Sequence, residues 1–519
     1  MPGIALGARR PGAYRVGMIA RPALRAVAVA ALAASCVQTV HRTEHADLTT
    51  VDREAPFLKA HLRNGDLVVL DRWTADDRAR QVSGDGERFG ADRRLVERGP
   101  LTVALADVAL FETNTISTSP AVGAMAVLTV ASAATTVVCL TTPKACFGSC
   151  PTFYAPGDGE PVLQAEGFSD AIAPALETHD VDALWRTHVT DGHLTLRMTN
   201  EAYETHVVKA ADVLAVPRPA GTRVLSTGDR LWLATALAPA ATCAAAEGDC
   251  AAAVAAVDGR ERTSVTDPDD LGAREVIDLT FAAGPAAERG RAGVVIGARQ
   301  SLVTTFLLYQ GLSYLGPGAV RWLAGLAPRR SGDDRLARAL GGIEVQVPHG
   351  AGWVTVGEIY ETGPIATDVH LVVLPPGERG DRVRLKLPRG GWRIDHVARA
   401  ALAHEVTAQR IAPRAIRGTL GREYAAHRAP ATAFPIVTLP GDAYELDYDI
   451  PTGEVELLID SRGYYLEWMR ADWLAAPDPV AALMLVVDPA RALRALAPQW
   501  KRMEADAETT FWRSRYARP

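Results

Sequence analysis

Short runs of alternating apolar and polar residues, separated by turn residues, recur along most of this chain of 519 residues. In FLKAHLRNGDLVVLDRW, residues 57–73, two such runs flank Asn64 and Gly65. Asn-Gly in this setting is the strongest short-range signal of a β-hairpin, because both residues accept the positive φ angles of a type I′ turn. The pattern predicts a mainly β protein with some helices, an α+β fold whose sheets are antiparallel.

The spacing of these runs predicts several domains, as the length suggests, since folded units usually span roughly 100 to 200 residues. A small antiparallel β unit is predicted over 57–112. The polar, breaker-rich stretch PRRSGDDR at 328–335 is predicted to be a linker. It separates a β-rich domain over 144–327, with helices near its end, from a sandwich-like domain over 336–519 that ends in a helix.

An apolar segment over 113–143 interrupts the strand pattern. It contains no charged residue, and the stretch from Ala121 to Thr142 lies between two prolines. Its length suits a helix that spans a bilayer. Its many Ala, Gly, Ser and Thr residues add little to membrane insertion and suit close packing in a protein core equally well. Both a membrane span over 121–142 and a buried helix or hairpin therefore remain open.

The N-terminus has the pattern of an export signal. Five arginines precede the small, apolar run AVAVAALAAS at 26–35, and Cys36 follows at once. Basic residues, an apolar run and small residues before a cleavage point define a signal peptide. The stretch LAASC resembles a bacterial lipobox, in which the chain is cut before a lipid-modified cysteine. We therefore expect a signal peptide over 1–35, starting at Met1 or Met18, lipidation of Cys36, and a tether over 36–56.

A metal-binding pattern falls within this tether. His41, Glu44 and His45 have the H-x-x-E-H spacing of one class of zinc protease. A catalytic zinc needs ligands that lie on a rigid element and are held there by further contacts. These residues have no apolar helical neighbours, so we expect neither a metal nor another cofactor here.

Four cysteines form closely spaced pairs, Cys146 with Cys150 and Cys243 with Cys250. In an exported protein such pairs indicate local disulfides. Cys139 is left over in an apolar run, where a free cysteine commonly acts as a small hydrophobic residue. A redox-active pair is the alternative for the first two, but catalytic dithiols usually have only two intervening residues.

Three stretches carry a resemblance: CFGSCPTFY at 146–154, AEGFSDAIAPALE at 165–177 and NEAYETH at 200–206. Together they resemble uncharacterised bacterial envelope proteins of a lipoprotein-like kind. The resemblance covers residues 66–219. It implies a β-rich domain of an envelope protein and no particular activity.

An aromatic cluster near the C-terminus is the candidate binding surface. It consists of Tyr464, Tyr465, Trp468 and Trp473. Tyr and Trp dominate the contacts of binding surfaces, including those that recognise sugars. Burial of the same residues, closing a sandwich core, is the alternative.

Chemistry-bearing motifs are otherwise missing from the sequence. We find no nucleophile elbow, phosphate loop, dinucleotide-binding glycine pattern or EF-hand loop. Glu204 and His206 lie two apart on a predicted strand, where we expect an exposed polar face. The formal net charge of -6 and the lack of a basic stripe argue against nucleic acid as a partner. We therefore assign no catalytic residue.

These features favour an exported, lipid-anchored envelope protein with a binding or structural role rather than an enzyme. Val37 after the cysteine is not the aspartate that retains lipoproteins in the inner membrane, so we expect the outer membrane, facing the periplasm or the cell surface. Candidate partners are other envelope proteins or glycans. One alternative is an envelope hydrolase built from dispersed carboxylates and histidines, which a deep polar pocket between domains would favour. Another is a membrane-integrated assembly component that spans at 121–142.

Overall fold

The computed structural model describes residues 37–513 apart from several internal segments. The segments outside the description are 1–36, 46–47, 49–50, 56, 63–65, 90–94, 119–149, 158–160, 173–175, 203, 283–290, 317–338, 361–362, 422–429, 468–476 and 514–519. The predicted signal peptide, lipidation at Cys36, the apolar run at 121–142 and the linker at 328–335 therefore lie outside the described residues. Within them, the predicted fold class is confirmed: strands predominate, in several antiparallel sheets with few helices.

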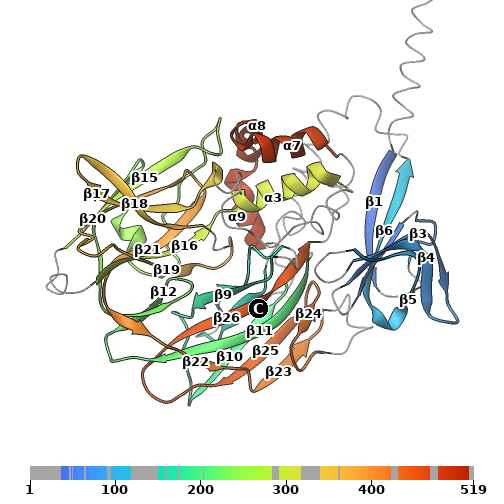
Figure 1. Ribbon diagram of the computed structural model, residues 1–519, viewed down its shortest axis with the longest axis horizontal. Coiled ribbons are helices and arrows are strands. Elements are labelled where there is room, and N and C mark those ends of the chain that lie inside the picture. Colours follow the sequence, from blue (N-terminus) through green and yellow to red (C-terminus); the bar gives the residue numbers. More distant parts are fainter. Residues whose placement is uncertain are drawn as a thin grey trace, which may run out of the picture.

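The N-terminal part folds into one antiparallel sheet of six strands with its own apolar core (Figure 1). Its strands are β1 (Val37–His45), β2 (Phe57–Leu62), β3 (Leu67–Asp76), β4 (Gln81–Phe89), β5 (Leu95–Ala104) and β6 (Val108–Thr118), in the order β1-β6-β2-β3-β4-β5, with the short helix η1 (Leu105–Asp107) between β5 and β6. The core includes Leu58 of β2, Leu70 of β3 and Phe111 of β6. Their side chains lie on the covered face of the sheet, since alternate residues of a strand point to the same face.

The first strand differs from the sequence-based expectation. Residues 37–45, predicted as part of a tether, pair residue for residue with β6. His41, Glu44 and His45 therefore lie in a strand of the sheet. The pairing supplies partners for the backbone of a segment whose own side-chain pattern is too polar to indicate a strand.

Two further sheets form a sandwich around a common core. One contains β7 (Thr152–Ala155), β8 (Val162–Glu166), β10 (His193–Thr199), β23 (Ala415–Thr419) and β25 (Ala443–Asp449). The other contains β9 (Thr178–Ala183), β11 (Glu204–Pro217), β22 (Gln409–Ile411), β24 (Ile436–Thr438) and β26 (Val455–Glu467). Side chains of both sheets, such as Leu196, Val208 and Ile459, are fully buried between them. The sandwich thus joins strands from 152–217 with strands from 409–467.

The chain between these two groups forms a sheet of ten strands. They are β12 (Arg223–Ser226), β13 (Leu231–Ala245), β14 (Gly248–Asp249), β15 (Arg274–Phe281), β16 (Arg291–Gln300), β17 (Ile343–His349), β18 (Gly352–Ile359), β19 (Asp368–Val373), β20 (Arg382–Pro388) and β21 (Trp392–Val406). Because β12 pairs with both β13 and β19, the strands β12, β19, β16, β21 and β13 close into a ring. In both the sandwich and the ten-stranded sheet, strands that precede the predicted linker at 328–335 pair with strands that follow it.

Four α-helices of the described residues pack together at one side of these sheets (Figure 1). They are α3 (Leu302–Leu315), α7 (Pro479–Val487), α8 (Pro489–Lys501) and α9 (Glu504–Arg513), and a short helix, η4 (Ala251–Val254), follows β14. Phe306 of α3 and Trp500 of α8 have ring centroids 5.3 Å apart within their shared core. No helix among the described residues is long and apolar enough to cross a membrane.

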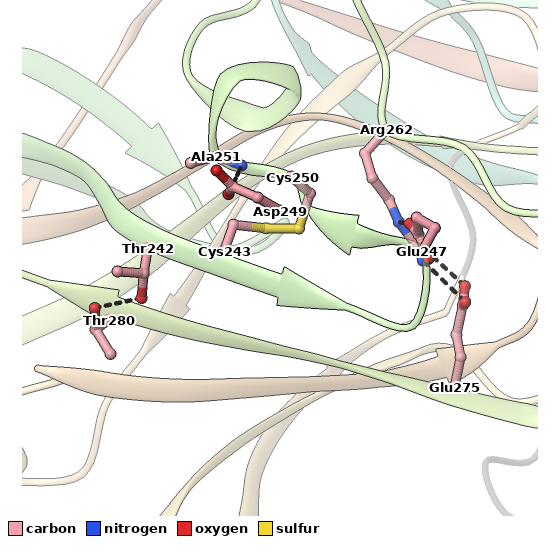
Figure 2. The surroundings of a disulfide bond; sticks show 9 residues. All are labelled: Thr242, Cys243, Glu247, Asp249, Cys250, Ala251, Arg262, Glu275 and Thr280. Carbon is pink, nitrogen blue, oxygen red and sulfur yellow. Dashed lines mark hydrogen bonds and ion pairs between the residues drawn. A yellow bond between two sulfur atoms is a disulfide. The ribbon is translucent and has the colours of Figure 1, made fainter.

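The predicted disulfide between Cys243 and Cys250 is confirmed (Figure 2). It joins β13 to the residue that precedes η4, and the Cys250 amide also donates to the Cys243 carbonyl at 2.9 Å. Nearby, Arg262 forms ion pairs with Glu247 and Glu275. The other predicted pair is not described, since Cys146 lies outside the described residues; Cys150 is buried just before β7.

Candidate functional site

A cavity of about 360 Å³ lies where the sandwich meets the ten-stranded sheet. Its polar and aromatic lining includes Gln164, Trp185, Arg186, Glu261, Asp395 and Trp512. These residues come from β8, the segment after β9, the loop before β15, β21 and α9. We call this cavity the junction pocket. Its position between two β-bodies is one where ligand sites commonly occur.

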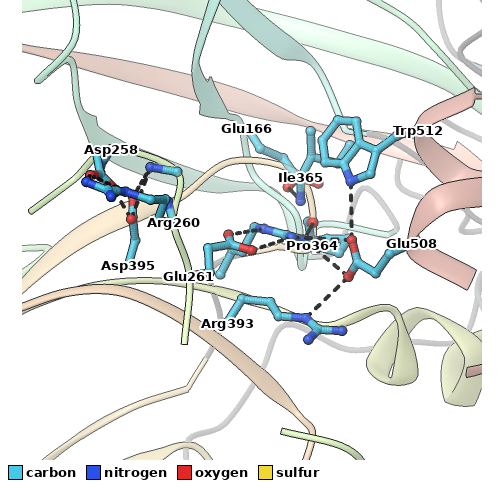
Figure 3. A network of polar contacts seen from close by, with 12 residues as sticks. Glu166, Asp258, Arg260, Glu261, Pro364, Ile365, Arg393, Asp395, Glu508 and Trp512 are labelled. Atoms are coloured by element: carbon cyan, nitrogen blue, oxygen red, sulfur yellow. Dashed lines mark hydrogen bonds and ion pairs between the residues drawn. The ribbon is translucent and has the colours of Figure 1, made fainter. Parts of the chain in front are cut away.

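A buried arginine, Arg299, lines the junction pocket, and its partners Glu261, Pro364 and Glu508 are labelled in Figure 3. Arg299 of β16 donates to both carboxylate oxygens of Glu261, at 2.6 and 2.8 Å, and to the Pro364 carbonyl at 2.7 Å. Glu508 of α9 lies 3.3 Å away on another side. Burial by itself lowers the pKa of Arg299, but Glu508 and Glu261 outweigh it and the pKa is raised. Arg299 is therefore a fixed cation whose charge is already balanced.

Glu508 also connects α9 to the pocket wall. It accepts a hydrogen bond from the Trp512 indole at 3.2 Å and lies 3.5 Å from Arg393 of β21. Figure 3 shows Glu508 between these two side chains. The carboxylate thus holds the indole of Trp512 at the edge of the junction pocket.

Asp395 lines the junction pocket and holds the backbone of a neighbouring turn. This carboxylate is 2% exposed and accepts hydrogen bonds from the Gly259 amide at 3.1 Å and from the Asp258 amide at 3.4 Å. Burial raises the pKa of Asp395, and these amide bonds oppose the rise. By holding the 258–259 turn, Asp395 fixes the loop that carries Glu261 into the pocket.

Trp185 and Arg186 follow β9 and also line the junction pocket. The Gln164 side chain accepts from the Arg186 amide at 3.2 Å and donates to the Arg186 carbonyl at 3.1 Å, which fixes this backbone. The guanidinium of Arg223 stacks 4.0 Å from the ring of Trp185. The Arg186 guanidinium is exposed, and it interacts electrostatically with Asp258, a carboxylate that accepts its hydrogen bonds from Arg260. Arg186 is thus a charged group of the pocket that is available to a ligand.

Glu166 lies buried beside the junction pocket. Its carboxylate accepts a hydrogen bond from the Ile365 amide at 2.7 Å and so links β8 to the segment before β19. Burial, with a smaller contribution from Asp180, raises the pKa of Glu166 to about 7. At neutral pH this group is therefore close to the midpoint of its titration.

Further acidic groups lie close by, on β9 and β19. Burial and Asp368 raise the pKa of Asp180 to about 7, and burial and Asp180 raise the pKa of Asp182. Burial also lowers the pKa of His370, but Asp368, 3.0 Å away, outweighs this and raises it. The contact between the two β-bodies therefore concentrates acidic groups around a single histidine of the described chain.

The predicted aromatic surface is not found at the two residues that the structure describes. Tyr464 and Tyr465 of β26 are 1% and 4% exposed and belong to the sandwich core. The Tyr465 hydroxyl donates to the Ser169 carbonyl at 2.9 Å. Trp468 and Trp473 lie outside the described residues. Burial, the alternative reading, therefore applies to both tyrosines, because β26 lies between β11 and β9 with a second sheet over it.

The expectation of an exposed polar face at Glu204 and His206 is wrong. Both residues are fully buried, and the Glu204 carboxylate lies 3.1 Å from the His206 imidazole. Alternation correctly placed the two side chains on one face of a strand. That face points into the protein, which alternation alone does not reveal.

Sequence reasoning did not single out the residues of the junction pocket. Trp185, Arg186, Glu261 and Asp395 lie far apart in the sequence and belong to no motif. Within the described chain, no group of three or more His, Cys, Asp or Glu residues is arranged to hold a metal ion. No protein-family profile, curated protein or solved structure matches the chain.

Proposed function

We propose that this chain is an exported, lipid-anchored protein of the bacterial envelope that binds a small polar ligand in the junction pocket. The observation that carries the binding role is the pocket itself, a cavity of about 360 Å³ with a preformed polar and aromatic lining. Cavities of roughly 300 to 1,000 Å³ with a few fixed polar groups are typical of ligand sites. The role is binding rather than catalysis.

The chemistry of the lining favours a ligand that carries an acidic group. Arg299 is neutralised by Glu261 and Glu508, whereas Arg186 is exposed and interacts only through space with Asp258, whose hydrogen bonds come from Arg260. Trp185 and Trp512 add flat apolar surface beside these polar groups. Flat surface combined with hydrogen-bonding groups suits a sugar ring. We propose an acidic saccharide of the envelope as the ligand class.

Export and anchoring rest on the N-terminal sequence. The signal-peptide pattern ends in LAASC at Cys36. The disulfide between Cys243 and Cys250 supports an oxidising compartment, since structural disulfides are rare in the cytosol. Lipidation at Cys36 followed by Val37 makes the outer membrane, facing the periplasm or the cell surface, the proposed location.

A hydrolase is the second candidate, because Glu261 and Asp395 both line the junction pocket. In this structure both carboxylates already have other partners. Glu261 accepts from Arg299 with both oxygens, and Asp395 accepts from the backbone of the 258–259 turn. A general acid or base must reach the proton it transfers. The pocket therefore supports binding better than hydrolysis.

The test of binding is titration calorimetry of the full chain with acidic oligosaccharides released from envelope polysaccharide. We expect Arg186→Ala to weaken binding about tenfold to a hundredfold, since a hydrogen bond to a charged group contributes about 1.5 to 3 kcal/mol. Arg230→Ala, which removes an exposed arginine that pairs with Glu405 outside the pocket lining, is the matched control and should bind normally. Equal affinities for the two variants would refute the proposed site.

The test of anchoring is the intact mass of the protein from bacterial membranes beside a Cys36→Ser variant. We expect the wild type to begin at Cys36 with added acyl mass, and the variant to lack both features. An uncleaved, unmodified wild type would contradict the envelope assignment.

A further inference from the structure

The helix α7 exposes an unusually apolar surface. Its sequence, PVAALMLVV, contains no charged or polar side chain. Its four large exposed side chains are Val480 (71% exposed), Leu483 (61%), Val486 (59%) and Val487 (55%). Single exposed apolar residues are ordinary, but a contiguous group of this kind marks an interaction surface.

These four side chains lie on one face of the helix. At about 100° per residue, they fall within an arc of about 120°. Leu485, on the other side, is 5% exposed and packs into the core that α3 and α8 share. Asp478 caps the helix by accepting from the Val480 and Ala481 amides. The apolar face is therefore presented by a helix that is already formed and held in place.

A second copy of the chain is a poor occupant for this face. A helix of nine residues is only about 14 Å long. Stable protein interfaces bury about 800 Å² on each partner. One face of such a short helix supplies a small part of that area. A surface that needs no shape complementarity, such as a lipid layer, suits the face better.

The ends of the N-terminal sheet indicate where a membrane would lie. Val37 pairs with Thr118, so β1 begins where β6 ends. Figure 1 shows this end of the sheet and α7 both at the upper side of the molecule. Cys36 directly precedes Val37, and the uncharged run 121–142 follows Thr118. The predicted site of lipidation is therefore joined to the described structure on the side where α7 is exposed.

Charges of both signs lie next to α7 in the sequence. Asp478 and Asp488 cap its two ends, and the next helix, α8, carries the exposed Arg491 and Arg494, of which Arg494 lies 3.8 Å from Asp270. The apolar side chains, rather than a net positive charge, therefore carry the case for a lipid surface.

We propose that α7 inserts the side chains of Val480, Leu483, Val486 and Val487 into the surface of the bilayer that carries the anchor. This proposal rests on the proposed lipid anchoring at Cys36. The contact adds a second attachment point to the acyl chain and fixes the orientation of the sheets relative to the membrane, which a single attachment point does not do.

Hydrogen exchange with mass spectrometry tests the contact on the purified full protein, with and without vesicles of phosphatidylethanolamine and phosphatidylglycerol. We expect the amides of 479–487 to exchange about tenfold more slowly when vesicles are present. Leu483→Ser/Val487→Ser should lose this protection. Val276→Ser/Val354→Ser, which alters two exposed strand residues, is the matched control and should keep it.

The outcomes separate this proposal from the anchoring on which it rests. Acylated protein that binds vesicles without protection of α7 would overturn the contact and leave the anchor intact. Protection of α7 without vesicles that increases with protein concentration would identify a second copy as the occupant and overturn the membrane contact. Unmodified Cys36 in the intact mass would contradict the anchoring, whatever the exchange of α7.

Discussion

Replacing Glu166 by glutamine should remove part of the pH dependence of folding. Glu166 is 1% exposed, and its carboxylate accepts from the Ile365 amide at 2.7 Å. Glutamine has the same shape, retains a carbonyl oxygen for this hydrogen bond and carries no charge. The substitution therefore changes the titration while keeping the contact between β8 and the segment before β19.

The magnitude follows from the pKa of Glu166, which burial raises from 4.5 to about 7 in the folded protein. The folded state then binds the proton more tightly than the unfolded state between these values. This group contributes most stability below pH 4.5, loses it as the pH rises to 7, and changes little above. A difference of 2.5 pKa units corresponds to about 3 kcal/mol at 1.36 kcal/mol per unit.

Urea unfolding at intervals from pH 4.5 to 8 measures this effect. We expect the free energy of unfolding of Glu166→Gln, relative to wild type, to rise by about 3 kcal/mol across this range. Glu454→Gln, at a side chain that is 62% exposed, is the control and should follow the wild-type curve. If Glu166→Gln also keeps the wild-type slope, Glu166 titrates normally and the argument from burial is wrong.

Two further predictions concern the backbone and the disulfide. At Gly363 φ is +76° and an added Cβ would overlap the Glu166 carboxylate, so Gly363→Ala should lower the free energy of unfolding by about 3 kcal/mol. Gly259→Ala, at φ +82° with open space around it, is the comparison and should lose only about 1 kcal/mol; equal losses in urea unfolding would rule out the overlap. Cys243→Ala/Cys250→Ala should cost about 2 kcal/mol, because the bond closes a loop with a sequence separation of 7. A reducing agent should destabilise wild type and leave this variant unchanged, and an equal response of both proteins would contradict the prediction.

The local sequence pattern predicted where strands form, but it did not predict which distant strands pair with one another. The runs around Asn64-Gly65 do form the paired strands β2 and β3, because a hairpin needs only neighbouring residues. In contrast, β10 pairs with β25, with His193 opposite Asp449. Nothing in either strand specifies the other, so the sharing of a sandwich by two distant parts of the chain was not predictable from alternation.

The junction pocket escaped prediction for a related reason. Arg186 and Asp395 belong to strands and loops with no shared motif, and they meet only because β9 and β21 belong to bodies that pack together. Tyr464 and Tyr465 were predicted as a binding surface and are buried instead. Residue type did not distinguish the two, because tyrosine occurs in binding surfaces as well as in cores. Which face of a strand is covered depends on the sheet above it.

The sequence by itself determined the fold class, the disulfide between Cys243 and Cys250 and the expectation of export, because alternation, close cysteine spacing and a basic-apolar N-terminus act through neighbouring residues. Only the tertiary structure decided that Glu166 is buried, that Arg186 lines a pocket between distant strands, and that α7 is uncovered. The physical reason is that burial, ion pairing and the pKa values they set depend on distances between groups that the chain brings together only when it folds.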